Sequence, residues 1–364
     1  MLCLIRCKEP YDAQISPSTT NNLVVEGIIN ATGRTTIALS RTLPLKDPAK
    51  IKVETNAQVS VIAEDNSVYD IKETGNGTYT SGLLFLNTNQ KYRLHIKTNN
   101  GGEYLSDYVA VKQTPPIDSV SFTLENDGVH ISVSTHDPKN TSRYYKWDYE
   151  ETWEIHSAYA NYLKYANGSI GTRTATEVTK LYSCWTTQNS TSIVLGSSAK
   201  LANDVINLAP IVFIPNESEK TSVRYSILIN QYSLDRKSYD FYQMLKSNTE
   251  SLGSVFDPLP SEVTGNINCV SNPLEKVIGY IGASAVAQKR FFINSNQVNS
   301  KFALPCATTY VTNKPDSFKL YFGSLGLLPY QADPPFGPPL GYFSSSPYCI
   351  DCTLRGSSVK PSFW

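Results

Sequence analysis

Short apolar runs separated by Asn- and Gly-rich turns fill the first third of the chain and constrain its fold most strongly. The runs are about five to eight residues long, and several alternate apolar with polar residues, as residues 92–97 do. Such alternation places side chains on the two opposite faces of a strand. The segments Gly75-Asn76-Gly77 and 99–102 are typical hairpin turns. The pattern predicts a mainly β protein that begins with an antiparallel, immunoglobulin-like β-sandwich over residues 23–113.

A pair of prolines ends this first region. Thr114-Pro115-Pro116 removes two backbone donors and holds the chain extended, as in a link between domains. Strand-like runs resume after it, and residues 223–231 alternate clearly between apolar and polar. We therefore expect a second immunoglobulin-like β-sandwich over residues 117–293, in tandem with the first. Apolar residues on one helical face predict a short helix inserted into this second domain near residues 234–247.

The C-terminal region, residues 294–364, is expected to be irregular and Pro-rich. Residues 333–339 read Asp-Pro-Pro-Phe-Gly-Pro-Pro, which excludes a helix or a central strand. Most chain ends are polar and frayed, but this one finishes in Phe363-Trp364. That much aromatic surface would be poorly soluble on a loose end. We expect the tail to dock through Arg355, Phe363 and Trp364, with both rings buried against the second domain or a partner.

The length and charge of the chain limit the number of domains and the classes of partner. The chain has 364 residues, with 40% hydrophobic and 18% charged residues and a formal net charge of zero. This is enough apolar material for packed cores and enough length for two or three domains. A neutral chain lacks the positive field that draws proteins to nucleic acid, so we expect no nucleic-acid partner. No apolar run is long enough to cross a bilayer as a helix.

The first seven residues resemble the end of an export signal. Leu4 stands three residues before Cys7, as in bacterial lipoprotein signals, in which the cysteine becomes the lipidated first residue. Residues 8–22 are polar and contain two prolines, as expected of a tether. We expect residues 1–22 to be a signal remnant, a lipid-anchor region at Cys7 and a tether. Arg6 stands where a small residue is usual, and the alternative is an ordinary N-terminal strand that contains two cysteines.

Apart from Cys3 and Cys7, five cysteines remain as disulfide candidates: Cys184, Cys269, Cys306, Cys349 and Cys352. In an exported protein four of them would form two bridges, and one would stay free or pair between chains. The best candidate joins Cys306 to Cys349 or to Cys352, because all three lie in the C-terminal third. The Cys349-x-x-Cys352 spacing favours a structural disulfide. A free or intermolecular thiol and a metal site are the alternatives, although the helix context of a redox motif and a full zinc ligand set are missing.

The common catalytic sequence motifs are absent from the chain. The sequence contains no His-Glu-x-x-His, no Gly-x-Ser-x-Gly and no phosphate- or dinucleotide-binding glycine loop. His130 and His136 would share one strand face and could hold a metal together with Asp137, but surface histidines are far commoner. We expect no catalytic residue, no metal and no cofactor.

An aromatic stripe is the remaining candidate binding feature. Tyr145, Trp147 and Tyr149 alternate along one strand and so share a face. They could form a platform on which a sugar or peptide stacks, but the inward face of a sandwich is the favoured interpretation. The neighbouring acids Glu150 and Glu151 would point to opposite faces, so they do not form an acid/base pair.

Several segments together resemble domain-of-unknown-function family 4249, a family of bacterial lipoproteins typical of Bacteroidota. They are residues 7–12, 22–27, 36–41, 77–79, 91–94, 279–280 and 289–290, with the tail residues 349–356 and 360–364 as the most specific marks. The resemblance implies a lipid-anchored outer-membrane protein, often encoded beside a TonB-dependent receptor and serving nutrient uptake or surface assembly. It supplies no catalytic residues.

The N-terminal cysteine, the strand-rich sequence, the absence of catalytic motifs and the family resemblance together predict a non-catalytic lipoprotein of the outer membrane, exposed at the cell surface. It would be an accessory or ligand-capturing partner of a TonB-dependent transporter, held to the membrane by its N-terminal lipid. The alternatives are a structural surface or adhesion module, or a carbohydrate-active sandwich enzyme built around Trp147 and residues 150–154. The enzyme would need two carboxylates that face each other across a cleft about 5–10 Å wide.

Overall fold

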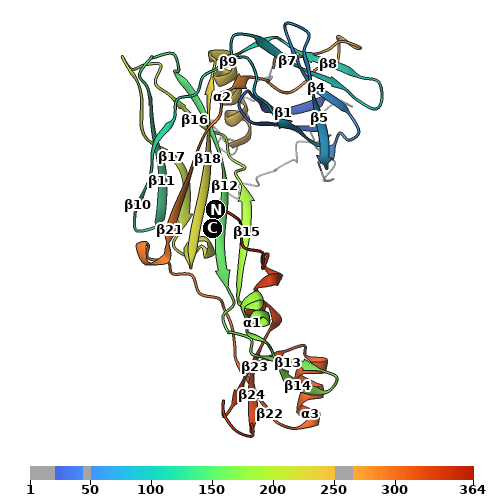
Figure 1. Cartoon of the computed structure of the whole chain (residues 1–364), viewed down its shortest axis with the longest axis vertical. Coiled ribbons are helices and arrows are strands. Elements are labelled where there is room, and N and C mark those ends of the chain that lie inside the picture. Colours follow the sequence, from blue (N-terminus) through green and yellow to red (C-terminus); the bar gives the residue numbers. More distant parts are fainter. Residues whose placement is uncertain (1–20, 44–50, 251–264) are drawn as a thin grey trace, which may run out of the picture. The chain divides into compact units, whose positions relative to one another are not determined.

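The computed structural model describes residues 21–43, 51–250 and 265–364 (Figure 1). The chain is mainly β, with 48% strand and 14% helix. It divides into two compact units, and both are discontinuous in sequence. The first unit contains Met1–Gln113 and Leu234–Val286, and the second contains Thr114–Ser233 and Ala287–Trp364. Cys7 and nearly all of the expected tether lie outside the described residues.

The first unit is built around one large sheet whose strands alternate between buried and exposed side chains. Its strands are β1 (Leu23–Asn30), β2 (Arg34–Arg41), β3 (Lys52–Val53), β4 (Gln58–Ala63), β5 (Val68–Gly75), β6 (Thr78–Leu83), β7 (Lys91–Lys97), β8 (Glu103–Ser106), β9 (Val109–Lys112), β19 (Ile267–Cys269) and β20 (Ala283–Ser284). Buried aliphatic and tyrosine side chains, among them Leu39, Val61, Tyr79 and Leu94, fill its interior. The predicted strands and turns are therefore present where the alternation placed them.

The arrangement of these strands differs from the expected sandwich, because the sheet closes on itself. Neighbours run in the order β7-β4-β5-β6-β2-β1-β20-β9, and β9 pairs with β7 to complete an eight-stranded closed barrel. The closing strand, β20, runs parallel to both β1 and β9. It is only two residues long and comes from far along the chain. Neither its length nor its content marks it as a strand in the sequence.

The predicted helix exists as α2 (Arg236–Glu250), but it belongs to the first unit. Its buried Phe241 lies 5.7 Å from the ring of Tyr280, between ring centroids. The expectation that it is inserted into the second sandwich is wrong. The helix begins immediately after the chain leaves the second unit, and the segment Leu234–Val286 returns to the first. The pattern of its apolar face located the helix but carried no information about which core that face would meet.

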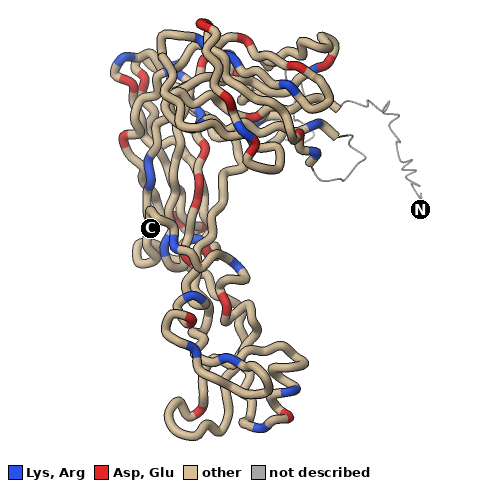
Figure 2. The backbone as a smooth tube through the Cα atoms, turned by 45° about the vertical axis from the view of Figure 1, so that its right-hand side comes forward, with Lys and Arg blue, Asp and Glu red and all other residues tan. Residues whose placement is uncertain are grey.

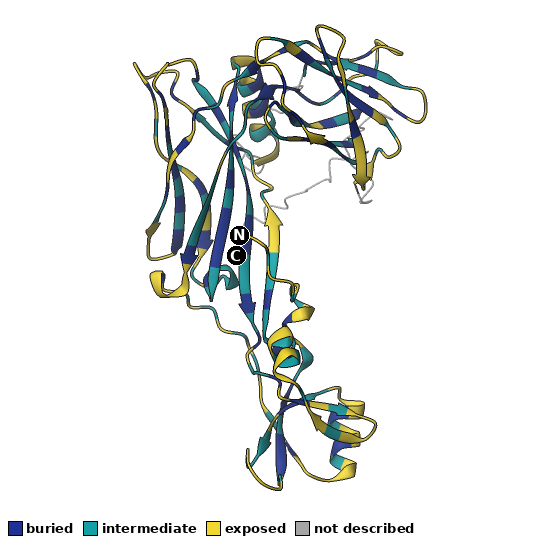
Figure 3. Cartoon of the chain, in the orientation of Figure 1, coloured by how far each residue is buried: buried dark blue, intermediate teal, exposed yellow. Residues whose placement is uncertain are grey.

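The second unit contains two sheets that share one core. The first has the order β10 (Ile117–Leu124), β11 (Gly128–Asp137), β17 (Asp204–Pro215). The second has the order β15 (Ser183–Asn189), β12 (Tyr144–His156), β18 (Arg224–Leu234), β21 (Ala287–Asn294), with β16 (Val194–Ser197) also paired to β12. Residues of both sheets, including Ile131, Trp147 and Ile227, form a single buried cluster. Figure 3 shows this buried face as dark segments along the strands.

The region expected to be irregular contains a small sheet of its own. β22 (Thr309–Thr312), β24 (Gly341–Ser345) and β23 (Leu328–Asp333) pair in that order. Together with the hairpin β13 (Leu163–Ala166)–β14 (Ser169–Thr172), α3 (Pro315–Phe318) and η3 (Lys319–Ser324) they surround a separate core. We call residues 163–172 and 309–345 the small β-subdomain. Its strands have only four to six residues, so the prolines between them dominated the sequence pattern.

Short helical segments complete the second unit. They are α1 (Ala175–Tyr182), η1 (Glu219–Thr221), η2 (Ser295–Gln297), α4 (Pro347–Ile350) and η4 (Cys352–Leu354). Acidic and basic residues are interspersed along both units (Figure 2). Among the described helices, none has the length and apolar character needed to span a membrane.

Candidate functional site

The aromatic stripe is part of the core of the second unit. Tyr145 and Trp147 are fully buried, and Tyr149 is 8% exposed. The indole of Trp147 donates to Oε1 of Gln231 at 2.8 Å, and the hydroxyl of Tyr145 donates to Asp204. Burial, together with that carboxylate, holds the pKa of Tyr145 well above its usual range. The stripe therefore cannot serve as a stacking platform, and the inward-facing interpretation is the correct one.

The acids that follow the stripe are each held by a different partner. Glu151 is buried and accepts from Nζ of Lys220 at 2.6 Å and from the Tyr225 hydroxyl at 2.8 Å. Glu150 lies on the opposite face of β12 and pairs with Arg290 at 3.3 Å. Glu154 shares the face of Glu150, but four residues of strand separate them by about 13 Å. No two of these three carboxylates form the facing pair that the carbohydrate-active alternative requires.

The outer face of the β15-β12-β18-β21 sheet instead receives the C-terminal tail. We call residues 351–364 the tail. The tail first adds a bridge to the edge strand β15, where Trp185 and Ser357 exchange two backbone hydrogen bonds of 2.8 Å. The Thr186 hydroxyl also donates to the carbonyl of Arg355 at 3.0 Å. The tail thus begins as an extension of the sheet.

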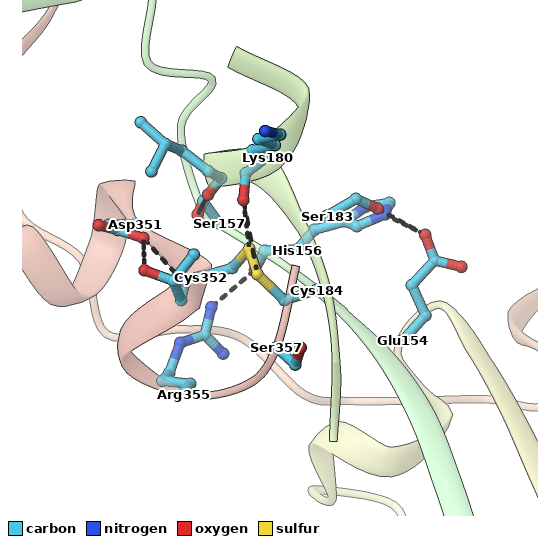
Figure 4. The surroundings of a disulfide bond; sticks show 12 residues. Glu154, His156, Ser157, Lys180, Ser183, Cys184, Asp351, Cys352, Arg355 and Ser357 are labelled. Carbon is cyan, nitrogen blue, oxygen red and sulfur yellow. Dashed lines mark hydrogen bonds and ion pairs between the residues drawn. A yellow bond between two sulfur atoms is a disulfide. The ribbon is translucent and has the colours of Figure 1, made fainter. Parts of the chain in front are cut away.

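A disulfide fixes the start of the tail to β15. Cys184 and Cys352 are bonded across 168 residues of sequence, with their Cα atoms 5.7 Å apart (Figure 4). Both cysteines are fully buried, against Ile155 of β12. In Figure 4 the bond lies between α1, which carries Lys180, and the turn that carries Arg355.

A second disulfide holds the segment just before the tail. Cys306 and Cys349 are bonded with their Cα atoms 5.8 Å apart. The carbonyl of Cys349 accepts from the backbone N–H of Ala158 at 2.9 Å. The sequence left Cys349 and Cys352 as equal partners for Cys306, and the structure pairs Cys306 with Cys349. Cys184 came from outside the C-terminal third, so its pairing with Cys352 was not foreseen.

Arg355 is the main polar anchor of the tail. Its side chain is 6% exposed and forms an ion pair with Glu219 of η1. Its other terminal nitrogen donates to the carbonyl of His156 at 2.8 Å, and its guanidinium lies 5.1 Å from the ring centroid of Tyr348. The expected role of Arg355 in docking is consistent with these contacts.

The two terminal aromatic residues dock on charged side chains and are not buried. The guanidinium of Arg290 lies 3.5 Å from the ring centroid of Phe363, which remains 38% exposed. Trp364 is half-buried; it packs edge-on to Phe292 at 5.8 Å between centroids and lies under Arg224 at 5.3 Å. The expected burial against the second domain is only partial, because the rings lie on an outer sheet face lined by arginines and do not enter a core. Burial against a partner stays a prediction.

Glu154 connects the end of the tail to the sheet. Its Oε2 accepts from the indole of Trp364 at 3.3 Å, and its Oε1 accepts from Ser183 at 2.6 Å and contacts His156 at 3.0 Å. Burial alone would raise the pKa of Glu154, but the hydrogen bonds from Ser183 and His156 outweigh it and lower the pKa. The contacts of Arg224, Arg290 and Glu154 with the tail were not foreseen from the sequence, because these residues and the tail lie far apart along the chain.

A shallow depression of about 440 Å³ opens beside the start of β18 and the end of β21. It is lined by Ser222, Ser295 and residues 298–302, which include Lys301 and Phe302. Hydroxyl and amide groups dominate this lining, with a single cation. Such a surface suits a small polar ligand.

The histidines are engaged with nearby acids. Nδ1 of His136 lies 2.7 Å from Asp118, and Asp137 accepts several hydrogen bonds from its own turn, so the trio with His130 is not assembled. His130 instead lies beside Asp127 and Glu125, and one potential ligand atom from each of the three residues lies within 4.8 Å of the other two. All three are on the surface. Their carboxylate and imidazole groups are of the kinds that bind cations, but exposed acidic groups like these are common without a bound ion, so they do not define a metal site.

A buried ionic cluster in the first unit was also missed by sequence reasoning. Arg41, whose side chain is 4% exposed, pairs with Glu54 at 2.6 Å and with Glu275 at 3.0 Å. The Tyr104 hydroxyl donates to Glu275 at 2.7 Å, and burial together with this bond raises the pKa of Tyr104 to about 12. The remaining disulfide candidate, Cys269, is a buried free thiol near Glu275. This cluster joins β2 to the segment that follows β19 and is structural.

A family model covers most of the chain. The model described as a domain of unknown function, DUF4249, matches residues 8–290. The chain belongs to this family. The match includes the first unit and most of the second unit's sandwich, but it ends before the small β-subdomain strands β22–β24 and before the tail. A search of curated proteins finds no relative of the chain.

Three solved structures show weak similarities to the chain. A two-domain fibronectin type-III segment of chicken tenascin is 10% identical, with coverage of 59% of this chain and 91% of that chain and a TM-score of 0.16. A DUF4785 family protein of Legionella pneumophila is 9% identical, with coverage of 57% and 52% and a TM-score of 0.17. Chitinase ChiA74 of Bacillus thuringiensis is 14% identical, with coverage of 53% and 29% and a TM-score of 0.16. Scores this low do not bear on the fold or function of the chain.

Proposed function

We propose that this DUF4249 protein is a non-catalytic, lipid-anchored protein of the bacterial outer membrane, from a bacterium of the Bacteroidota type. In this proposal it acts as an accessory or ligand-capturing partner of a TonB-dependent transporter. The observation that carries the proposal is the pair of disulfides, Cys184–Cys352 and Cys306–Cys349. Structural disulfides persist in oxidising compartments and are rare in the cytoplasm, so they support export.

A binding role fits the chemistry of the described surface better than catalysis does. The three acids that follow the aromatic stripe, Glu150, Glu151 and Glu154, are each held in ion pairs or hydrogen bonds. Their placement does not suit the paired acid/base catalysis of a glycoside hydrolase. The two sheets of the second unit share one buried core, and two disulfides hold its C-terminal region. Rigid β-frames commonly present loops to partners.

The lipid anchor is tested at the N-terminus. Cys7 would carry the lipid, and the polar residues after it would act as a tether. Cys7→Ser, expressed with the native export signal, should move the protein from the membrane fraction to the soluble periplasmic fraction. Cys3→Ser is the matched control and should stay with the membrane. If both variants fractionate with the membrane, the anchor is not at Cys7.

The transporter partnership is tested by mild chemical cross-linking in native membranes, followed by affinity purification in detergent and mass spectrometry. We expect one TonB-dependent transporter to be recovered in amounts similar to the bait. Recovery of the bait alone would favour the structural or adhesion role. Sugar hydrolysis by the purified chain that is lost in Glu151→Gln or Glu154→Gln would favour the enzyme instead.

A further inference from the structure

The depression beside the start of β18 has an apolar part and a polar part. Val298 is buried and Phe302 is half-buried, and both belong to its lining. The remaining lining residues carry three hydroxyl groups, one carboxamide and one ammonium group, and they are Ser222, Ser295, Ser300, Asn299 and Lys301. Sites for small molecules combine apolar surface with a few polar groups in this way, and the volume of the depression lies in their usual range.

Backbone hydrogen bonds hold the walls of this depression in place. The N–H of Ser295, at the start of η2, donates to the carbonyl of Val223 at 3.0 Å. The N–H of Lys301 donates to the carbonyl of Asn216 at 2.8 Å. These bonds tie the segment after β21 to the segment between β17 and β18. A site that is formed before its ligand arrives loses less entropy when the ligand binds.

Lys301 gives the depression a positive charge without a counter-charge in its walls. The residue is exposed, and the described lining includes no Asp or Glu. Two other cations nearby in the sequence are engaged elsewhere. Lys220 pairs with Glu151 at 2.6 Å. The guanidinium of Arg224 lies 4.5 Å from the ring centroid of Phe292. One cation in a neutral polar lining favours a ligand with a single negative charge, such as a carboxylate.

The uncharged groups of the lining favour a sugar. The Ser295 hydroxyl and the Asn299 carboxamide can both donate and accept hydrogen bonds, as the hydroxyl groups of a sugar also do. Val298 and Phe302 supply apolar surface on which the C–H groups of a sugar ring can pack. A phosphate group is a poorer match, because it is usually held by several charge-assisted hydrogen bonds, often from Arg, and this lining offers one cation.

We propose that this depression binds an acidic sugar, namely a uronic acid residue of a small saccharide. The carboxylate pairs with Nζ of Lys301, and the sugar ring packs against Phe302. The sugar hydroxyl groups bond to Ser295 and Asn299. The inference rests on the ligand-capturing role in the proposed function, because it names the class of ligand that would be captured. It requires neither the lipid anchor nor the transporter.

Isothermal titration calorimetry of the full-length chain tests the site. The probes are the disaccharides of galacturonic acid and of glucuronic acid, with the neutral disaccharides of galactose and glucose as matched controls. At least one acidic disaccharide should bind saturably, and its neutral counterpart should bind about tenfold more weakly or less, because it lacks the charge-assisted bond. Added salt should weaken binding of the acidic sugar and leave the neutral sugar unaffected.

A substitution of the cation separates the charge from the fold. Lys301→Met should reduce the affinity for the acidic disaccharide to that of its neutral counterpart. Its thermal unfolding should equal that of the parent chain, because the Lys301 side chain is exposed and the residue is held through its backbone. Lys319→Met, at an exposed lysine outside the depression, is the control and should bind like the parent chain.

The inference is overturned if neither acidic disaccharide binds, if the neutral counterpart binds as tightly, or if Lys301→Met leaves the affinity unchanged. It is also overturned if inorganic phosphate displaces the sugar at a lower concentration than the sugar itself needs to bind. Recovery of a transporter by a chain that binds no acidic sugar overturns the sugar site alone. Binding of the acidic sugar by a chain that recovers no transporter upholds the sugar site and overturns the partnership.

Discussion

Arg355 shows how one side chain can hold a segment whose sequence looks like a loose end. Its guanidinium joins the tail to η1 through Glu219 and to β12 through the carbonyl of His156. Because the side chain is 6% exposed, water and salt screen these interactions little. Breaking such a pair leaves a charge in a poorly solvated position.

Arg355→Met should therefore lower the free energy of unfolding of the second unit by about 3–5 kcal/mol, because Glu219 loses its partner. The matched control is Lys164→Met, which breaks an exposed ion pair with Glu177 and should cost at most about 1 kcal/mol. Urea unfolding followed by near-UV circular dichroism measures both. Equal, small effects would show that the ion pair does not hold the tail.

Asp137 should make stability depend on pH. Burial alone would raise its pKa, but hydrogen bonds from Thr141, Lys139 and Ser142 outweigh burial and lower the pKa to about 2. A carboxyl group with a lowered folded-state pKa stabilises the fold above its unfolded value near 4 and loses that contribution as pH falls. The second unit should thus lose stability between about pH 4 and pH 2.

Asp137→Asn should be less stable at pH 7, since its amide would face backbone donors, and should show a weaker loss of stability with acid. The exposed residue Glu217 provides the control for loss of a surface carboxyl group, as Glu217→Gln should leave stability at pH 7 unchanged. Thermal unfolding across the pH range decides the matter. An unchanged acid slope in Asp137→Asn would contradict the assignment.

At the residue scale, the sequence showed which side chains share a strand face, but not which residues they contact. The alternation of Tyr145, Trp147 and Tyr149 identified one strand face, and burial showed that it is the inner one. Nothing local indicated that Trp364 would meet Glu154, since 210 residues separate them. Contacts that depend on long-range pairing leave no periodic signal.

At the element scale, the tail is held by a disulfide at its start and by aromatic contacts at its end. The Cys184–Cys352 bond closes a loop of 168 residues, and a disulfide that closes a long loop restricts the unfolded chain strongly. The bridge between Trp185 and Ser357 then aligns the tail with β15. The disulfide at the start of the tail and the aromatic contacts at its end can each be removed by a separate variant.

The double variant Cys184→Ser/Cys352→Ser should reduce the stability of the second unit by about 2–5 kcal/mol. It should also make the tail accessible to proteases, because the tail would then depend on non-covalent contacts. Cys269→Ser, which alters a buried free thiol in the first unit, is the control and should leave the second unit unaffected. Limited proteolysis and calorimetry give the two readouts. An intact tail in the double variant would show that the Cys184–Cys352 disulfide is not needed to hold it.

Deletion of residues 360–364 should reduce stability by about 1–2 kcal/mol, since it removes two half-exposed rings and their cation–π contacts. The disulfides should still form. Replacing only Phe363 and Trp364 with alanine should give nearly the same loss, and Val359→Ala, at a residue that is 75% exposed, should give none. A deletion that costs nothing in thermal unfolding would mean that the rings rest on the sheet without stabilising it.

Elements were predictable where their own residues specify them. The alternating strands of the first unit and the helix α2 were located close to their observed positions. The closure of the first sheet was not, because β20 supplies only Ala283 and Ser284 and finds its partners by tertiary packing. The sheet β22–β24 was hidden for a similar reason, since its strands are short and its long connecting loop is rich in proline.

At the scale of the whole molecule, the chain crosses between its two units more than once. Residues Leu234–Val286 return to the first unit before Ala287 re-enters the second. A boundary at the Thr114-Pro115-Pro116 signal could be read locally, but the return could not, because no turn or composition change marks it. The second unit is then completed by a disulfide-held C-terminal region, and these disulfides are the feature that supports the proposed export.

The most direct test of this account is the intact mass of the chain purified from native membranes without reducing agent. The account predicts a mature protein that begins at a lipid-modified Cys7 and lacks two hydrogen atoms for each of the two disulfides. An unmodified Cys7, or a protein whose Cys184, Cys306, Cys349 and Cys352 are all reduced thiols, would contradict it.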